Sequence, residues 1–372
     1  MLRRLSIVML VLLLLSSPAP APAQHSCATF SMGRILATAP DQRPVAMNAY
    51  LFDYALSWRS SGPDYWKYYH RYPDFGFRLS YAKMPFGVAG NRFGAVGFMQ
   101  VPIRPCFDWS VGLGLSAYTE PYSATFDKAN DYIGSVLNCL IDLGLIYKIP
   151  VDDEGAVALQ ARFLHTSNGY IRKPNLGLNY WQFGIGYDLA PVRSLSLVEP
   201  EAVAVADSVE LHFRPSNHVF LSYAPGLVQS RHKLKDGYYY TYTAEVGFLR
   251  RFHPCHVWGV NLDVMMNGSH PEWLRARHEV PPPAYLGGCV LYEGFYGPMS
   301  IRLSIGMNIT RSSLIYIPVY ERVGLFFHFG REGRQYGGLA MKAYMGHVDY
   351  LEWTYGLMLP LKMRLPGRQV RL

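Results

Sequence analysis

Apolar and polar residues alternate along most of the chain after its first two dozen positions. Between Val157 and Phe163 every second residue is apolar, and the residues between them include Gln160 and Arg162. Rows of this kind, one apolar and the other small, polar or charged, recur at residues 107–115, 181–189, 258–264, 301–308 and 351–359. Because successive side chains of a β-strand point to opposite faces, the alternation predicts strands that are apolar on one face and polar on the other.

Strands of this kind suit a transmembrane β-barrel, whose outer face meets lipid and whose interior is polar. The pattern places strand starts near residues 28, 46, 75, 91, 105, 131, 155, 178, 209, 237, 256, 283, 299, 318, 336 and 350. We therefore predict an all-β fold, a transmembrane antiparallel β-barrel of about 12–16 strands. No linker divides the mature chain, so we expect residues 24–372 to form this single barrel domain.

Charged residues also fall on the inner rows, among them Arg162, Glu245, Asp263, Arg302 and Glu352. A secreted β-sandwich would alternate in the same way, but a soluble core rarely tolerates so many inward charges. In a barrel we expect these side chains to neutralise one another. The inner rows therefore favour the barrel over the sandwich.

The composition indicates a membrane protein without helical spans. Half of the residues are hydrophobic, 28 are tyrosine and 17% are charged. No later stretch approaches the run of about 18 apolar residues that a spanning helix needs. Residues 1–23 have the features of a cleaved signal peptide, with Arg3 and Arg4 before an apolar run and small residues before Gln24. We therefore expect export to the outer membrane.

Cysteine usage and charge narrow the possible cofactors and partners. The five cysteines include no C-x-x-C pair and no metal-ligand cluster, so we predict no metal and no other cofactor. The net charge of +8 is modest and suits an anionic membrane surface. We expect lipids rather than nucleic acid as partners.

Polar, reactive residues interrupt one of the apolar rows. His165 and Ser167 continue the row that ends at Phe163, about 6.6 Å apart along the strand. Residues 168–178 have the Gly, Asn and Pro content of a hairpin loop, and Asn179 opens the next strand on the same face. An antiparallel hairpin would place Asn179 beside the pair. The three residues then fit a serine nucleophile, a histidine base and a group that orients the base.

At these residues the chain resembles the PagL-type lipid A 3-O-deacylases, a family of outer-membrane barrels. The resemblance rests on His165-x-Ser167-Asn168 and Lys173-Pro174-Asn175-x-Gly177, and it extends to residues 72–76, 130–135 and 350–353. It implies hydrolysis of the ester that holds an acyl chain at the 3-position of lipid A in lipopolysaccharide. Carried over to this chain, Ser167 attacks and His165 acts as the base. Asn168, with the backbone N–H of Gly169, would hold the oxyanion.

One position departs from that family. Its shorter members carry a glutamate where this chain has Asn179. An amide can fix the tautomer of an imidazole but cannot stabilise the imidazolium by charge, so we expect slower chemistry. In the adjoining loop, Arg172 and Lys173 are expected to contact the phosphates of lipid A.

A non-catalytic outer-membrane barrel is the alternative from another functional class. The inward charges would equally line the pore of a porin-like channel, and the outer surface could bind lipopolysaccharide without cleaving it. Conductance in a planar bilayer and tolerance of Ser167→Ala would identify a channel. Lipid A binding that survives the loss of Ser167, without acyl release, would identify a binding protein.

Overall fold

A computed structural model describes residues 24–36, 48–85, 89–123, 130–189, 207–210, 212–229, 237–315, 318–345 and 347–361. The predicted signal peptide, residues 1–23, lies outside these ranges. Among the helices within them, none is both long and apolar enough to cross a membrane.

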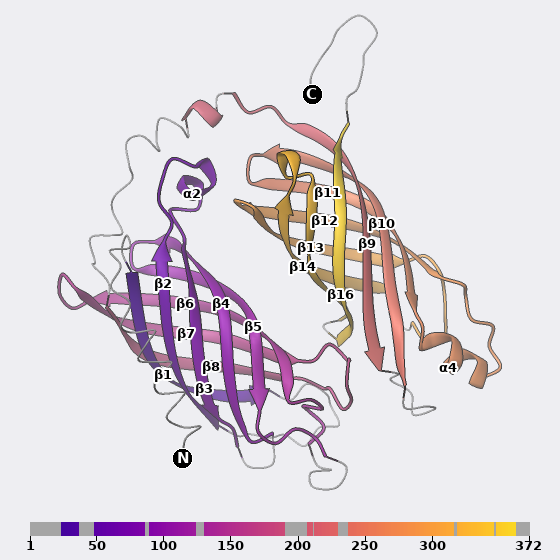
Figure 1. Ribbon diagram of the computed structural model, residues 1–372, viewed down its shortest axis with the longest axis horizontal. Helices are drawn as coiled ribbons and strands as arrows, with labels where there is room; N and C mark the ends of the chain where they lie inside the picture. Colours follow the sequence, from indigo (N-terminus) through magenta and orange to yellow (C-terminus); the bar gives the residue numbers. More distant parts are fainter. Residues whose placement is uncertain are drawn as a thin grey trace, which may run out of the picture.

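The first eight strands form a closed antiparallel barrel (Figure 1). They are β1 (Gln24–Leu36), β2 (Asn48–Arg59), β3 (Asp74–Lys83), β4 (Asn91–Arg104), β5 (Phe107–Tyr118), β6 (Leu137–Pro150), β7 (Gly155–Ser167) and β8 (Leu178–Leu189). Each strand pairs with its neighbour in the chain, and β8 pairs with β1 to close the sheet. A short helix, α2 (Tyr65–Tyr69), lies in the connection between β2 and β3.

The remaining strands form a second closed antiparallel barrel. They are β9 (Ser216–Gln229), β10 (Tyr238–His253), β11 (His256–Asn267), β12 (Tyr285–Tyr296), β13 (Met299–Asn308), β14 (Val319–Phe329), β15 (Gln335–Tyr344) and β16 (His347–Pro360). Helix α4 (His270–Ala276) lies between β11 and β12, and the 3-10 turn η2 (Arg331–Gly333) between β14 and β15. The pairing of β16 with β9 closes this sheet.

The predicted all-β antiparallel barrel architecture is confirmed, but the strands of the described residues form two barrels of eight rather than one of about 12–16. The structure corrects the expectation of one barrel over residues 24–372, because the sheet closes twice. Alternation shows which face of a strand is apolar, and hairpins pair chain neighbours in one large barrel as they do in two small ones. Only the long-range pairs β1 with β8 and β9 with β16 distinguish the two cases, and no local pattern encodes them.

Buried ion pairs occupy the interior of the first barrel. The Asp142 carboxylate accepts from the guanidinium groups of Arg78 and Arg162, and its Oδ1 lies 2.9 Å from Nε of Arg162. Arg162 also bonds Asp53 at 2.9 Å. An eight-stranded barrel is just wide enough for side chains to fill its interior. This network therefore packs the barrel in place of a wide aqueous channel.

The second barrel has its own buried network. Arg322 lies 2.7 Å from Glu245, 3.3 Å from Asp263 and 3.2 Å from Glu352. A separate pair joins Arg302 to Glu293 at 2.9 Å. The expected mutual neutralisation of inward charges is thus confirmed, because Arg162, Glu245, Asp263, Arg302 and Glu352 each pair with an opposite charge of their own sheet.

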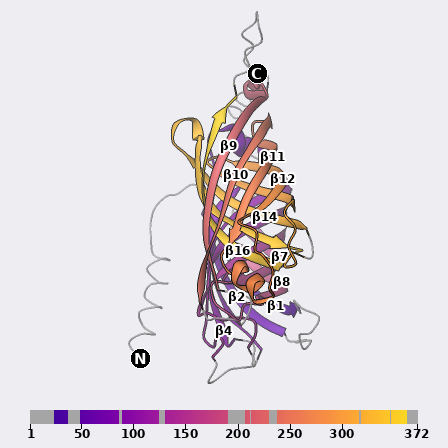
Figure 2. The ribbon, with the colours of Figure 1, turned by 90° about the vertical axis from the view of Figure 1, so that its right-hand side faces the viewer.

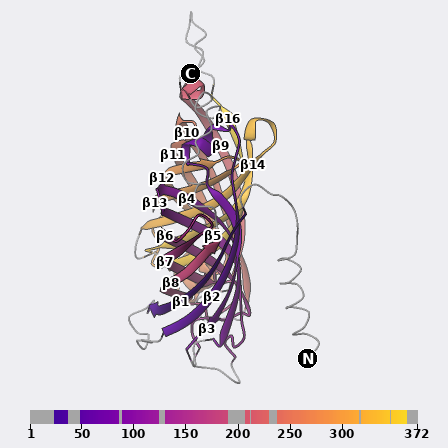
Figure 3. The same cartoon turned by 90° about the vertical axis from the view of Figure 1, so that its left-hand side faces the viewer.

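The two barrels stand side by side, and either one largely covers the other when the molecule is viewed edge-on (Figures 2 and 3). At one end, the loop between β7 and β8 touches the end of β9. The backbone N–H of Gln229 donates to the carbonyl of Tyr170 at 2.8 Å, and the Gln229 side-chain oxygen accepts from the backbone N–H of Lys173 at 2.7 Å. The C-terminal ends of β1, β3, β5, β7 and β9 therefore lie at the same end of the molecule.

Helix α2 joins the barrels at the opposite end. The Tyr69 hydroxyl lies 2.8 Å from Nε2 of His256, and the Nε2–H of His70 donates to the carbonyl of Phe295 at 3.0 Å. The Trp66 ring packs so closely on Gly297 that a Cβ there would come within 2.8 Å of it. Contacts at both ends therefore set the spacing between the two outer walls.

Candidate active site

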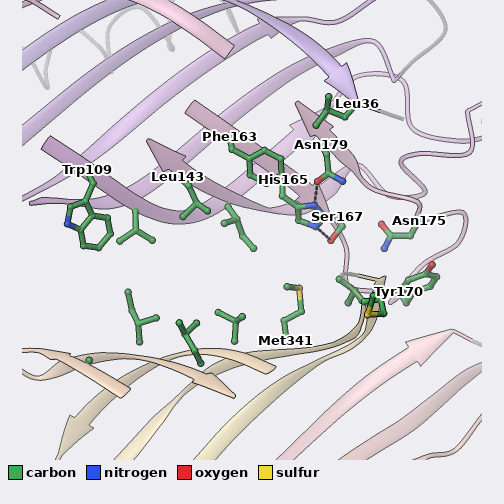
Figure 4. Close-up of a pocket in the computed structure, with 18 of the residues that line it drawn as sticks. Leu36, Trp109, Leu143, Phe163, His165, Ser167, Tyr170, Asn175, Asn179 and Met341 are labelled. Carbon is green, nitrogen blue, oxygen red and sulfur yellow. Dashed lines mark hydrogen bonds between the residues drawn. The ribbon is translucent and has the colours of Figure 1, made fainter. Parts of the chain in front are cut away.

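His165 and Asn179 are directly paired residues of neighbouring strands. The register between β7 and β8 places His165 opposite Asn179, as the predicted hairpin required. Nδ1 of His165 lies 2.6 Å from Oδ1 of Asn179, and its Nε2 lies 3.0 Å from Oγ of Ser167, the last residue of β7 (Figure 4). The structure thus brings the three residues together on the outer wall of the first barrel.

The amide oxygen determines what the imidazole can do. Oδ1 of Asn179 can only accept a hydrogen bond, so Nδ1 of His165 carries the proton. The lone pair of Nε2 is then free to accept the Ser167 hydroxyl hydrogen. This arrangement has the form of a base next to a nucleophile, with a third group that fixes the base. The same bonds satisfy polar atoms that would otherwise be costly on an apolar surface.

Asn168 organises the loop that follows Ser167. Its Nδ2 donates to Oγ of Ser135 and to the carbonyl of Arg172, both at 2.8 Å. Its Oδ1 accepts from the Arg172 N–H at 3.3 Å, and its backbone N–H donates to Oδ1 of Asn175 at 3.0 Å. Every N–H of Asn168 is therefore engaged within the first barrel. The expected oxyanion donor has no N–H left to offer in this arrangement.

In Asn175 the side-chain oxygen is engaged and the amide hydrogens of Nδ2 are not. Its Oδ1 accepts a hydrogen bond from the backbone N–H of Asn168. The Asn175 side chain lines the same cleft as Ser167 (Figure 4). Within the described part of the chain, no group accepts a hydrogen bond from its Nδ2. Asn175 belongs to the motif that the sequence singled out, but only the loop conformation shows that its amide hydrogens are available at the cleft.

The other predicted site residues lie in the same loop. Gly169 adopts a φ of 63°, a conformation that other residues rarely adopt. A Cβ there would also come 3.0 Å from the Cβ of Leu351 in the second barrel, so glycine fits for both reasons. Arg172 is exposed at this end of the barrel. Lys173 is half-buried, and its backbone N–H bonds Gln229.

Ser167 opens into a cleft of about 860 Å³ between the two barrels. The first barrel contributes the polar groups His165, Ser167, Asn175 and Asn179, together with apolar side chains of β5, β6 and β7. The second barrel contributes apolar side chains from its outer wall, such as Met341 opposite Ser167 (Figure 4). No sequence signal linked these strands to the site.

Solved structures with a detectable likeness to this chain have low sequence identity and low TM-scores. Two mutant porins of Rhodopseudomonas blastica are 10% and 9% identical, with TM-scores of 0.19 and 0.20, over 90% of this chain and 99% of theirs. CdiB from Acinetobacter baumannii is 7% identical with a TM-score of 0.18, over 92% of this chain and 61% of its own. With TM-scores this low, we infer nothing about this chain from these structures. No curated protein matches it.

Two protein-family models match the chain, one in each barrel. Lipid A 3-O-deacylase (PagL) matches residues 52–188, and the acyloxyacyl hydrolase C-terminal domain (PagL_C) matches residues 215–360. Together they cover more than half of the chain; the first match begins within β2 and ends in β8, and the second spans β9 to β16. The chain therefore belongs to the PagL lipid A 3-O-deacylase family, as a longer two-domain member with an acyloxyacyl hydrolase C-terminal domain.

Proposed function

We propose that the chain is a serine-type ester hydrolase that removes an acyl chain from the 3-position of lipid A. The observation that carries this proposal is the line of contacts from Asn179 through His165 to Ser167, at 2.6 Å and 3.0 Å. Membership of the lipid A deacylase family supplies the substrate class. No cofactor is needed, because the nucleophile and the base both come from β7.

The reaction follows from these contacts. Nε2 of His165 takes the hydroxyl proton as Oγ of Ser167 attacks the ester carbonyl, and the new C–O bond gives a tetrahedral oxyanion. The intermediate collapses as the C–O bond to the sugar breaks, and Nε2 returns the proton to the sugar oxygen. Water, deprotonated by the same nitrogen, then attacks the acyl-enzyme. The fatty acid leaves and Ser167 regains its proton.

The oxyanion needs hydrogen-bond donors at the cleft. The family resemblance pointed to Asn168 and the N–H of Gly169, but the amide of Asn168 is engaged in its own loop. We assign the side-chain role to Nδ2 of Asn175, and the Gly169 N–H, which bonds no described group, remains the proposed second donor. A donor of this kind contributes about 3–4 kcal/mol to transition-state stabilisation.

Asn179 is the residue from which we infer the rate of deacylation. It holds the productive tautomer of His165, which preserves the function of the base. A neutral amide gives the imidazolium less stabilisation than a carboxylate, since hydrogen bonds to charged groups are the stronger ones. We therefore propose a competent but slow deacylase.

We propose that the chain lies in the outer membrane with its active site toward the outer leaflet. The connections of residues 168–177 and 268–284 lie at the site end, whereas residues 105–106, 151–154 and 254–255 are short turns at the other end, where residues 60–73 form one longer connection that carries α2. Outer-membrane barrels have short periplasmic turns and longer external loops. In this orientation Arg172 and Lys173 meet the phosphates of lipopolysaccharide.

The test is mass spectrometry of lipid A from cells that express the wild-type chain or Ser167→Ala. The expected result is loss of one hydroxyacyl chain with the wild type and intact lipid A with the variant. Intact lipid A in both, with the protein folded in the outer membrane, would overturn the proposal. Lipid A that still co-purified with the protein would then identify a binding barrel. The side chains that fill both interiors argue against a wide channel.

A further inference from the structure

Apolar rows from the two barrels face each other across the cleft. On the first barrel, Val111, Leu143 and Phe163 are register partners on β5, β6 and β7. On the second, Leu303, Val323 and Met341 are register partners on β13, β14 and β15. All six line the cleft that contains Ser167. Each row is thus continuous across three strands, and together they make two apolar walls.

The reactive and amide side chains of the cleft lie at one end. These are His165, Ser167, Asn175 and Asn179, beside the β7–β8 loop (Figure 4). At the far end, Trp109 of β5 meets Tyr296 of β12 edge to face, with ring centroids 6.4 Å apart. A molecule that fits this shape has a polar, reactive head and an unbranched apolar tail.

The length of the cleft matches such a tail. Register places Trp109 level with Ala161, six residues before Ser167 on β7. At about 3.3 Å per residue this is roughly 20 Å. One leaflet of a bilayer holds hydrocarbon about 15 Å deep, half the thickness of the apolar core. The cleft is therefore long enough for one extended acyl chain with its ester carbonyl at Ser167.

We propose that the acyl chain to be cleaved lies in this cleft, and that the outer wall of the second barrel determines which chain lengths are accepted. The inference rests on the proposed function, since the chain is placed by its ester at Ser167. Contacts at Gln229 and at α2 hold the two walls at a fixed spacing. The second barrel thus acts as one side of the substrate site, although it contributes no group to the chemistry.

The test narrows the cleft at Val323, on the wall that the second barrel contributes. Val323 and Val260 both lie on the outer wall of the second barrel and are both 44% exposed, but only Val323 lines the cleft. The full-length protein in detergent is assayed on lipid A with a 3-hydroxydecanoyl or a 3-hydroxytetradecanoyl chain at the 3-position. Val323→Trp should lower turnover of the longer chain by about tenfold relative to the shorter one. Val260→Trp should leave that ratio unchanged.

Two further measurements test the inference even if the tryptophan variant misfolds. Val323→Ala widens the cleft and should raise turnover of the longer chain relative to the shorter one. Retention of both lipids by the Ser167→Ala protein is measured with and without Val323→Trp, and the long-chain lipid should be lost selectively. Unchanged ratios and unchanged retention would overturn the inference. If the wild type retains both lipids but cleaves neither, while Val323→Trp selectively abolishes retention of the long-chain lipid, only the proposed function is overturned.

Discussion

The seventh strand of each barrel lines the same cleft, yet the two strands differ in chemistry. On β7 the outward row ends in His165 and Ser167, and a long loop over residues 168–177 follows. On β15 the corresponding wall carries Met341, and only residues 345–346 separate the strand from β16. Each barrel is a closed eight-stranded sheet with ion pairs in its interior.

This difference shows where the function is placed in the fold. The closed sheet supplies a rigid wall, and the reactive groups sit where the apolar row is broken beside a long loop. The loop of the first barrel provides amide groups and the turn of the second provides none of the site's polar side chains. Catalysis is therefore expected to depend on β7, β8 and their loop, and substrate fit on β13, β14 and β15.

The largest expected effect comes from changing Asn175, whose loop amide belongs to the catalytic side of the cleft. Asn175→Ala removes the proposed oxyanion donor and should lower kcat for lipid A deacylation by about 10²–10³-fold. KM should change little, because the donor acts mainly in the transition state. Steady-state kinetics on purified protein in detergent would measure both values.

Asn175→Asp separates chemistry from loop structure. The aspartate keeps an oxygen that can accept the Asn168 N–H, but it replaces Nδ2 with a second carboxylate oxygen. If Asn175 stabilises the oxyanion, the aspartate variant should be at least as impaired as the alanine variant. Recovery of activity with aspartate would show that the residue only shapes the loop.

A second prediction concerns the group that orients the base. Asn179→Asp keeps the shape of the side chain and its bond to Nδ1 of His165, but it adds a negative charge beside the imidazolium that forms during the reaction. Because charge-assisted hydrogen bonds are stronger by about 1–1.5 kcal/mol, kcat should rise by about tenfold. The measurement is the initial rate of acyl release at saturating lipid A.

Asn179→Ala is the matched control for that variant. It removes the bond that fixes the tautomer of His165, so its activity should fall below that of the wild type. Equal activity of the aspartate variant and the wild type would show that charge at this position does not limit the reaction. The slow step would then lie elsewhere, for example in entry of the lipid.

The sequence predicts the strands and the central contacts well. Starts expected near residues 91, 155, 178, 256 and 299 coincide with those of β4, β7, β8, β11 and β13. The two largest shifts are β6, expected near residue 131 and found at Leu137, and β9, expected near residue 209 and found at Ser216. The pairing of His165 with Asn179 followed from period-two alternation and one hairpin, and both are local properties.

Long-range and loop geometry could not be predicted in the same way. Alternation does not say that β8 returns to β1, so the second closure was missed. Asn168 and Asn175 are both loop amides, and only the folded loop decides which keeps a free donor. The apolar wall around Val323 follows the same pattern as any lipid-facing row. Its place in the same cleft as Ser167 depends on contacts between segments far apart in the sequence.

The smallest expected effect is that of Gln229→Ala, a substitution that tests whether the second barrel influences the chemistry. The Gln229 side chain accepts the N–H of Lys173 in the loop beside Ser167, so Gln229→Ala removes one hydrogen bond that holds this loop. A hydrogen bond of this kind is worth about 1 kcal/mol, which corresponds to about a fivefold loss of kcat if the full amount is felt in the transition state. Gln335→Ala is the control, because it also removes a side-chain hydrogen bond on the second barrel, from the Tyr355 hydroxyl at 3.2 Å, without touching the loop. If both variants behave like the wild type, the loop keeps its shape without Gln229. The second barrel would then serve the reaction only through the apolar wall that it presents to the substrate.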